Sequence, residues 1–316
     1  MPTPVLFDVD TGIDDALALL VATRSPELDL VGVGTIAGNV TASGAAFNTL
    51  RTLEAAGVTE VPVAVGVENF LLEPPHDASW IHGTDGIGDT DQPAPRGRPS
   101  GEHAVDQLLR LSHEHAGRLV VIATAPLTNL ALAMRKDATL CDRLAHIVIM
   151  GGSAQHGGNK AAWGEANIAN DPEAAQVVFA ADVPRTMIGL DVTMKVRFDQ
   201  DDLEALTAAS DPVANFAADL LPFYLGAYER VTGRRECAVH DALTVAAVID
   251  PDAFTLRSLP TQVETRGDLT RGMTVVDLRA RFANWPVGEQ PRTDVALDVD
   301  VDRAHALLLE RLGVRA

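Results

Sequence analysis

The sequence predicts an α/β fold in which a mostly parallel central sheet is flanked by helices, with a small β/α extension at the C-terminus. Two observations predict it. Over the first two-thirds of the 316 residues, short apolar segments alternate with segments of helical apolar spacing. From Leu256 the pattern changes to strands, followed by one last helix. We expect a single domain over residues 1–316.

The predicted elements follow this alternation along the chain. The expected strands are Val5–Asp10, Leu30–Ile36, Val61–Val65, Leu119–Thr124, Ile147–Met150 and Thr186–Asp191. The expected helices between them are Asp14–Arg24, Ala45–Ala56, Ala104–His115, Leu127–Arg135 and Pro172–Ala180. Further along, 201–230 is expected to be largely helical, 240–249 forms a helix, and the last helix covers 303–312.

Two stretches outside the alternation need an interpretation of their own. Residues 68–101 are rich in Pro, Gly and Asp and predict a long loop, and long loops in compact domains tend to be functional. Asp298, Asp300 and Asp302 alternate with valine, which indicates the solvated face of a strand. We therefore assign these three aspartates no function.

Composition limits the classes of function. Hydrophobic residues make up 47% and charged residues 22%, as in globular proteins, while the net charge is −19 and the pI about 4.7. Phosphates would be repelled, which argues against nucleic-acid or membrane partners and favours a small neutral ligand or a cation. Two distant cysteines, no expected signal peptide and no apolar run of membrane-spanning length fit a cytoplasmic location.

The segment LFDVDTGIDDALAL, residues 6–19, places four aspartates at one strand–turn–helix junction. Acids in the first turn of a helix favour its dipole, which gives Asp14 and Asp15 a purely structural interpretation. That interpretation does not reach Asp8 and Asp10, at the carboxyl end of the strand, where open α/β sheets bind ligands. Grouped carboxylates repel one another, and a hard cation such as Ca²⁺ or Mg²⁺ would relieve the repulsion. The segment therefore predicts a metal or catalytic site.

Three known motifs share parts of this segment. Asp10-Thr11-Gly12 matches the triplet of aspartic proteases, but those enzymes are all-β and here a helix follows. An EF-hand loop would need its glycine one place later and a glutamate where Leu19 stands. Phe7-Asp8-Val9-Asp10-Thr11 also resembles haloacid dehalogenase-type phosphatases, in which Asp8 would be the nucleophile. That family has no need of Asp14 and Asp15.

Four other stretches supply polar side chains at expected strand ends and loops. They are TIAGNV, ending near Asn39; WIHGTDGIGD, with His82; GNKAAWGEANIANDPEAA, residues 158–175; and AVHDAL, with His240 and Asp241. Each also has a structural interpretation: a turn asparagine, a loop histidine, and helix caps at Asp171 and at the His-Asp pair. Together they place carboxylates, amides and imidazoles where a site of an α/β sheet would be built.

These motifs, in this order from Asp8 to Ala242, resemble the nucleoside hydrolases of the inosine–uridine-preferring group. The resemblance implies a Rossmann-like fold, a homodimer or homotetramer, and hydrolysis of the N-glycosidic bond of ribonucleosides, as in purine and pyrimidine salvage. It implies a tightly bound Ca²⁺ held by Asp10, Asp15, Asp241 and the backbone carbonyl of Thr124.

The resemblance also implies the roles of the remaining site residues. Asp10 would be the general base on the calcium-bound water, and His240 the acid for the departing base, with His82 nearby and Tyr228 positioning it. The implied ribose-binding side chains are Asp14 and Asn39 at the 2′- and 3′-hydroxyls, and Asn159, Glu165 and Asn167 on the 5′ side. Asp8 is left with a structural role. A phosphatase, or a noncatalytic nucleoside- or ribose-binding protein on the same scaffold, remains the alternative.

The chain departs from this family at two positions. Thr11 stands where proline is common, and Ala166 stands where an aromatic residue is common, which removes part of an apolar wall. Trp80 and Trp163 could compensate, or could belong to the core. The departures bear on the preferred base.

Overall fold

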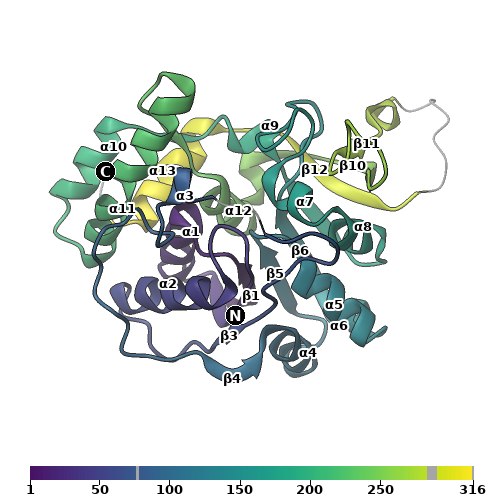
Figure 1. The fold of residues 1–316 in the computed structure, drawn as a ribbon, viewed down its shortest axis with the longest axis horizontal. Helices are drawn as coiled ribbons and strands as arrows, with labels where there is room; N and C mark the ends of the chain where they lie inside the picture. The colour runs from purple at the N-terminus through teal and green to yellow at the C-terminus, as the bar shows by residue number, and fades with distance from the viewer. Residues whose placement is uncertain (76–77, 283–289, 315–316) are drawn as a thin grey trace.

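We analysed a computed structural model that describes residues 1–75, 78–282 and 290–314. Ten strands form one sheet in the order β11-β10-β12-β7-β6-β5-β1-β2-β3-β4, with helices packed on both faces (Figure 1). Every neighbouring pair from β12 to β4 in this order is parallel. At the other edge, β10 pairs antiparallel with both β12 and β11. The predicted mostly parallel sheet is confirmed, and the C-terminal strands extend this same sheet.

The predicted strands lie close to their expected positions, whereas the edge strand at 100–103 was not predicted and begins within the expected loop 68–101. Their bounds are β1 Thr3–Val9, β2 Leu28–Thr35, β3 Val63–Val65, β4 Ser100–His103, β5 Leu119–Ala123, β6 Leu144–Met150, β7 Arg185–Ile188, β10 Phe254–Val263, β11 Thr274–Val276 and β12 Arg292–Val299. A separate pair, β8 Arg197–Phe198 and β9 Cys237–Ala238, forms a small ribbon. The strand expected over 186–191 ends early, because a short helix begins at Leu190.

The longer helices follow the predicted pattern, and the short helices at 79–82, 140–143, 166–170 and 190–193 were not predicted. They are α1 Ile13–Thr23, α2 Ala42–Ala55, α3 Ser79–His82, α4 Ala104–Glu114, α5 Thr128–Lys136, α6 Leu140–Arg143, α7 Ala166–Asn170, α8 Pro172–Ala180, α9 Leu190–Thr193, α10 Gln200–Ala208, α11 Pro212–Thr232, α12 His240–Ile249 and α13 Val301–Arg311. Asp211 and Pro212 divide the helical stretch 201–230, because the residue before proline disfavours helix. Within the described residues, every helix is too short or too polar to cross a bilayer.

The interpretation of the three C-terminal aspartates is partly wrong. Asp298 is exposed on β12 as expected. The strand ends at Val299, however, and Asp300 is the N-cap of α13, accepting a hydrogen bond from the backbone N–H of Arg303 at 3.1 Å. Asp302 lies within that helix. The alternation with valine continued past the strand because a helix N-terminus also favours acidic residues.

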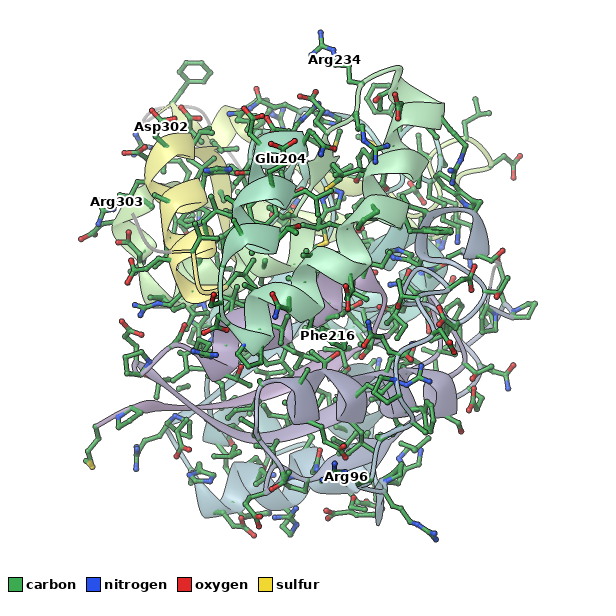
Figure 2. The ribbon with its side chains drawn as sticks, turned by 90° about the vertical axis from the view of Figure 1, so that its left-hand side faces the viewer. Arg96, Glu204, Phe216, Arg234, Asp302 and Arg303 are labelled. Atoms are coloured by element: carbon green, nitrogen blue, oxygen red, sulfur yellow. The ribbon has the colours of Figure 1, made fainter. Side chains whose placement is uncertain are left out.

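The sheet separates two apolar cores, and β1 contributes to both. Val5, Phe7 and Val9 pack in one core with α1, α11 and α12, whereas Leu6 faces the other core with α4, α5 and α8. Helix α1 is buried along almost its whole length, from Ile13 to Ala22. Acidic residues in its first turn are therefore held away from water. Charged side chains such as Glu204, Asp302 and Arg303 lie on the outer surface of α10 and α13 (Figure 2).

Strand β1 lies between β2 and β5 in the sheet, so the order of the strands along the chain reverses direction at β1. Such a reversal of strand order leaves a crevice at the carboxyl ends of the strands, where α/β proteins bind ligands. Asp10 directly follows β1 at this point, and Thr124 directly follows β5. The topology therefore brings the predicted polar stretches to one edge of the sheet.

Candidate functional site

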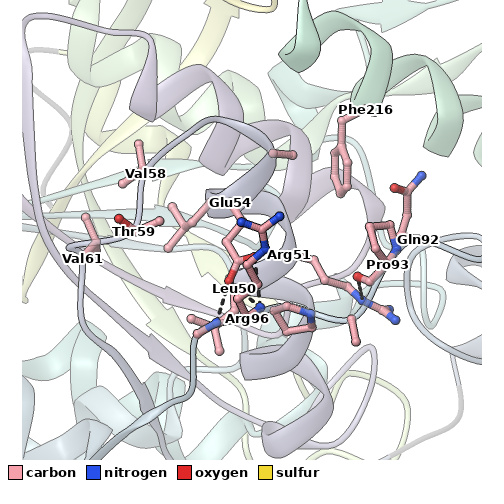
Figure 3. A pocket seen from close by; sticks show the side chains of 15 residues that line it. Leu50, Arg51, Glu54, Val58, Thr59, Val61, Gln92, Pro93, Arg96 and Phe216 are labelled. Carbon is pink, nitrogen blue, oxygen red and sulfur yellow. Dashed lines mark hydrogen bonds between the residues drawn. The ribbon is translucent and has the colours of Figure 1, made fainter.

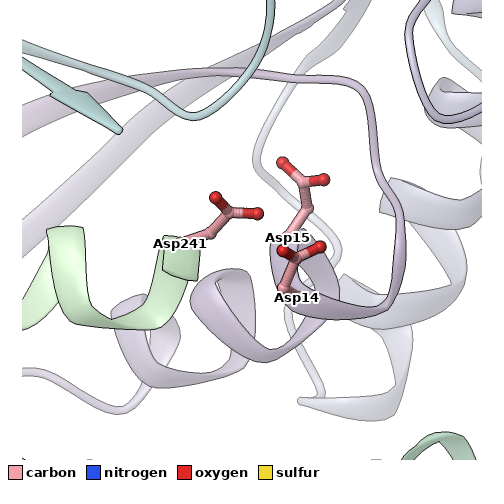
Figure 4. Close-up of side chains that lie close together, drawn as sticks. All are labelled: Asp14, Asp15 and Asp241. Carbon is pink, nitrogen blue, oxygen red and sulfur yellow. The ribbon is translucent and has the colours of Figure 1, made fainter. Parts of the chain in front are cut away.

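Three carboxylates meet at the carboxyl edge of the sheet. Asp14 and Asp15 lie in the first turn of α1, and Asp241 lies in the first turn of α12 (Figure 4). One oxygen atom from each lies within 4.8 Å of the others, and all three side chains are buried. Asp10 lies next to this group, and its carboxyl interacts with that of Asp15. The two helix starts and the end of β1 thus concentrate negative charge in one buried volume.

Burial and mutual repulsion make this group difficult to ionise. Burial raises the pKa of Asp10 and of Asp241 well above the usual range, and the neighbouring carboxylates raise both further. Burial, followed by the charge of Asp14, raises the pKa of Asp15 to about 7. A bound cation would favour the ionised forms instead.

Backbone and side-chain donors orient Asp10 and Asp15. Asn39 donates to Asp10 twice, from its backbone N–H at 2.8 Å and from Nδ2 at 3.1 Å. Asp15 accepts a hydrogen bond from the backbone N–H of Gly12 at 3.0 Å and from Thr124 Oγ1 at 2.7 Å. The loops after β1, β2 and β5 therefore fix the two carboxylates together.

Asp14 retains an acceptor that the described part of the chain does not satisfy. Its Oδ2 accepts a hydrogen bond from the Tyr224 hydroxyl at 3.1 Å, whereas its buried Oδ1 has no hydrogen-bond partner there. A buried carboxylate oxygen without a donor is costly and indicates a missing ligand or ion. The converging carboxylates all offer oxygen atoms as metal ligands, which fits a hard divalent cation such as Ca²⁺ or Mg²⁺.

The opposite wall of the site is built around Glu165. Glu165 caps α7, with its carboxylate accepting backbone N–H groups from Gly152, Asn167 and Ile168 at 2.9–3.1 Å. Burial raises its pKa, while these three hydrogen bonds oppose the rise. Ala166, which follows Glu165 in the chain, donates its backbone N–H to Asn159 Oδ1 at 2.9 Å. The wall is thus held rigidly by its own backbone.

Asn167 links this wall to the carboxylate group. Its Nδ2 donates to the backbone carbonyls of Thr124 at 2.9 Å and Met150 at 3.1 Å. The Thr124 carbonyl, a predicted metal ligand, keeps a second lone pair. Asn167 therefore orients that carbonyl within the site.

His240 and Tyr228 form the third side of the site. The Nε2 of His240 lies 2.8 Å from the Tyr228 hydroxyl, and its Nδ1 lies 2.7 Å from Thr193 Oγ1. Burial lowers the pKa of His240 to about 4, so the ring is neutral at neutral pH. The Tyr228 ring makes a T-shaped contact with the ring of Tyr224, whose hydroxyl donates to Asp14. An aromatic and imidazole surface therefore adjoins the carboxylates.

His82 packs against the start of α1. The backbone N–H of Ile13 donates to His82 Nδ1 at 3.2 Å, which places the hydrogen of the neutral ring on Nε2. Burial lowers its pKa, and the ring stacks on Tyr224 with centroids 5.5 Å apart. A helix N-terminus also favours the neutral form of a nearby histidine.

A cavity of about 470 Å³ opens onto most of these groups. The predicted residues among its lining are Asp14, Asn39, His82, Thr124, Asn159, Glu165, Asn167, Tyr228, His240 and Asp241. Asp10 and Asp15 lie beneath them. Trp80 also lines the cavity and is 53% exposed, whereas Trp163 is 49% exposed and does not line it. Neither tryptophan belongs to the core.

Sequence reasoning missed several residues of this site. Tyr224, His156 and Lys160 line the cavity, and Thr193 contacts His240. Tyr224 lies one helical turn before Tyr228, so the helical spacing of the two tyrosines was the one available signal. The others come from segments whose position depends on the fold.

Asp8 faces away from the cavity. Its carboxylate accepts a hydrogen bond from Asn129 Nδ2 at 2.8 Å, and Asn129 also donates to the backbone carbonyl of Thr35. Burial raises the pKa of Asp8 to about 7. This arrangement suits the structural role expected for Asp8.

A second cavity, of about 570 Å³, lies between α2 and the segment 92–97 (Figure 3). The charged side chains of α2 that line it are bonded to that segment. Glu54 accepts the backbone N–H groups of Arg96 and Gly97, and Arg51 donates to the carbonyl of Pro93. It shares no lining residue with the cavity at the carboxylates, so the chemistry belongs to the latter.

The chain is similar to known proteins over its whole length. A family model described as inosine-uridine preferring nucleoside hydrolase matches residues 5–306. The pyrimidine-specific ribonucleoside hydrolase RihA of Citrobacter koseri is 37% identical over 317 residues, covering 100% of both chains. The inosine-uridine preferring nucleoside hydrolase of Crithidia fasciculata is 34% identical, covering 99% of this chain and 98% of its own. The solved structure of the plant nucleoside hydrolase PpNRh1 superposes with a TM-score of 0.94 at 33% identity, covering 100% of both chains.

Proposed function

The chain belongs to the inosine-uridine preferring nucleoside hydrolase family of enzymes, and we propose that it hydrolyses the N-glycosidic bond of ribonucleosides in a calcium-dependent reaction. The products are ribose and a free nucleobase. The observation that carries the proposal is the convergence of Asp10, Asp14, Asp15 and Asp241 at a cavity that His240 and Tyr228 also line. Binding alone would not require both a base and a proton donor around one cavity.

We assign the metal to the carboxylates of Asp10, Asp15 and Asp241 and to the carbonyl of Thr124. Ca²⁺ in this position would supply positive charge and Lewis acidity, offsetting the repulsion between the carboxylates. Asp14 also belongs to the group of three converging carboxylates. We assign it to the ribose hydroxyls, because its Oδ1 has no donor among the described residues.

The chain holds the ribose from two sides. Asp14 and Asn39 are placed to bind the 2′- and 3′-hydroxyls, and Asn159, Glu165 and Asn167 the 5′ side. Cleavage gives the ribose ring oxocarbenium character, with positive charge on C1′ and the ring oxygen. Oriented carboxylate and amide oxygens stabilise that charge without reorganising.

Asp10 is the proposed general base. It accepts a proton from a water molecule whose oxygen adds to C1′, while the electron pair of the C1′–N bond moves to the base nitrogen. A cation bound beside Asp10 would favour its ionised form, which is the form that accepts a proton. Asp10 later returns the proton to solvent.

His240 and Tyr228 assist the departing base. Their adjoining Nε2 and hydroxyl provide a hydrogen bond to the nitrogen that receives the electron pair, which disperses its negative charge. The base then takes up one proton, so that the elements of one water molecule are divided between ribose and base. A neutral imidazole serves this purpose, as the lowered pKa of His240 requires.

The phosphatase alternative is not supported. A phosphatase of the haloacid dehalogenase type would need Asp8 as an accessible nucleophile. Asp8 is instead bonded to Asn129, which also bonds the Thr35 carbonyl, whereas the carboxyl of Asp10 interacts with that of Asp15 in the carboxylate group.

The wider setting follows from the family and the charge. We propose one domain over 1–316, a homodimer or homotetramer, a cytoplasmic location and a role in purine and pyrimidine salvage. The net charge of −19 disfavours nucleic acid and anionic membranes as partners.

The test is a substrate panel. The protein, with Ca²⁺ present, is incubated with inosine, adenosine, uridine, cytidine and p-nitrophenyl phosphate, and free ribose and phosphate are measured. We expect ribose from at least one nucleoside, no phosphate, and loss of activity on chelation that Ca²⁺ restores. Phosphate release, or nucleoside binding without ribose release, would contradict the proposal.

A further inference from the structure

Like the hydroxyl of Thr128, which bonds to Asp171, the hydroxyl of Thr193 departs from the usual pattern of threonine hydroxyls in helices. Those of Thr49, Thr52 and Thr207 donate to the carbonyl four residues earlier, a common pattern for helical threonine. Thr193 Oγ1 lies instead 2.7 Å from His240 Nδ1, across 47 residues of sequence. Thr193 is completely buried, so water cannot compete for this contact.

The position of the shared hydrogen follows from counting donors and acceptors. Among the described residues, His240 Nδ1 is the partner of the Thr193 hydroxyl. If Nδ1 carried the ring hydrogen, it would donate to Thr193, and the threonine hydrogen would be buried without an acceptor. Such a group costs about 1–3 kcal/mol. The favoured arrangement has Thr193 donating to Nδ1, which places the ring hydrogen on Nε2.

We propose that Thr193 is a positioning residue that holds His240 in the tautomer with its hydrogen on Nε2, which leaves the hydroxyl hydrogen of Tyr228 free for the leaving base. The proposal rests on the proposed function, because it assigns how His240 is prepared for that reaction. With the hydrogen on Nε2, His240 donates to the Tyr228 oxygen, 2.8 Å away, and the hydrogen of Tyr228 remains available to the cavity. In the other tautomer Tyr228 must donate to Nε2, which withdraws that hydrogen from the substrate.

The same short helix also positions the opposite wall of the cavity. Asp191 accepts the backbone N–H groups of Ala154, Gln155 and His156 at 2.6, 2.7 and 3.1 Å. These residues begin the loop that leads to Asn159. Helix α9, residues Leu190–Thr193, therefore contacts the base side through Thr193 and the 5′ side through Asp191. This arrangement suits a positioning role better than simple packing.

The test compares Thr193→Val, which keeps the shape but removes the hydroxyl, with Thr193→Ser, which keeps the hydroxyl. Thr244→Val is the matched control, because Thr244 is also fully buried and its hydroxyl faces the His240 backbone carbonyl at 3.5 Å, not the ring. The substrates are inosine, uridine and p-nitrophenyl riboside at saturating Ca²⁺. Nitrophenolate departs without a hydrogen bond.

We expect Thr193→Val to lower kcat on the nucleosides by roughly 10-fold or more and on the nitrophenyl riboside by at most about 2-fold, since only the first needs leaving-group assistance. Thr193→Ser should restore most of the loss. Thr244→Val should affect all substrates equally, if at all. Equal losses on every substrate in Thr193→Val would show that Thr193 is only structural.

A second measurement reads the tautomer directly. In protein labelled with ¹⁵N-histidine, and with the His240 signals assigned through His240→Gln, we expect hydrogen on Nε2 and none on Nδ1, and a mixture in Thr193→Val. Hydrogen on Nδ1 in the unaltered protein would overturn the proposal. Absence of any nucleoside hydrolysis by the unaltered protein would overturn the proposed function and, with it, the catalytic purpose of Thr193. The ¹⁵N spectrum would still show separately whether Thr193 sets the tautomer.

Discussion

Gly38 closes over the carboxylate of Asp10 at a distance that only glycine permits. A Cβ atom at position 38 would lie 1.9 Å from Asp10 Oδ2, far inside van der Waals contact. The next residue, Asn39, donates its backbone N–H to the same oxygen at 2.8 Å. The loop after β2 therefore holds Asp10 through one close approach and one hydrogen bond, and both depend on the absence of a side chain at 38.

This contact predicts that Gly38→Ala displaces Asp10 or the loop. Because displacement of a catalytic group by about 1 Å can cost on the order of 100-fold in rate, we expect at least a 10-fold loss of kcat and weaker Ca²⁺ binding. Calcium titration and steady-state kinetics check both. Gly101→Ala is the control, because a Cβ there meets nothing within 4 Å. Unchanged kinetics in Gly38→Ala would mean that Asp10 tolerates movement.

The metal-free protein should lose stability as the pH rises from about 4 to about 7. Burial raises the pKa of Asp8 and of Asp15 from 3.8 to about 7, so in this range the folded chain binds protons that the unfolded chain releases. Asp10 and Asp241 act in the same direction, whereas His240, whose pKa burial lowers from 6.5 to about 4, opposes it below pH 6.5. The four carboxyl groups outweigh this imidazole, so stability falls with increasing pH. Thermal unfolding in excess chelator should give a Tm lower at pH 8 than at pH 5, by about 5 °C or more.

Two comparisons test the cause of this pH dependence. Asp8→Asn keeps an oxygen acceptor for Asn129 and removes one titrating group, so the fall in Tm between pH 5 and pH 8 should become smaller. Added Ca²⁺ should raise Tm more at pH 8, where the carboxylates are ionised and the folded state alone holds the ion. A chelated protein that is more stable at pH 8 than at pH 5 would contradict the prediction.

Asp10→Asn should separate the hydrolase from a phosphatase. Asparagine preserves the shape but cannot accept a proton, and it weakens any metal held there. We expect kcat to fall by at least about 100-fold, in the range of general-base catalysis. Asp8→Asn should change stability more than kcat. The reverse pattern, an inactive Asp8→Asn and an active Asp10→Asn, would favour Asp8 as a nucleophile.

The strand–turn–helix around Asp10 could be predicted because local sequence determines it. An apolar strand, a Thr-Gly break and helical apolar spacing all lie within twenty residues. Strand β4, Ser100–His103, could not be predicted, because SGEH is polar and pairs only at the sheet edge. Helix α9 also could not be predicted, because four residues are too few to show a helical spacing of apolar side chains.

Site residues that only the fold brings together also could not be predicted from the sequence. Tyr224 bonds to Asp14 across 210 residues, and Thr193 meets His240 across 47. No local pattern marks such a pair, because a threonine or tyrosine in a helix has the same appearance whether its hydroxyl meets water or an imidazole. The carboxylates and amides of the site stood out only because they were grouped in short motifs.

The last prediction separates two roles of His240. As an aid to the departing base, its ring acts with Tyr228, 2.8 Å from Nε2. If His240 is only the first residue of α12, its role is to place the neighbouring Asp241.

In the first case, His240→Ala should slow inosine hydrolysis by at least about 100-fold and p-nitrophenyl riboside hydrolysis much less, because nitrophenolate is a stable anion that departs unaided. Tyr228→Phe should show the same selectivity, because the hydroxyl hydrogen of Tyr228 is the one left free for the leaving base. In the second case, a displaced Asp241 would weaken calcium binding and slow both substrates alike. Measuring kcat for both substrates at saturating Ca²⁺ distinguishes the cases, and equal losses would reduce His240 to a scaffold residue.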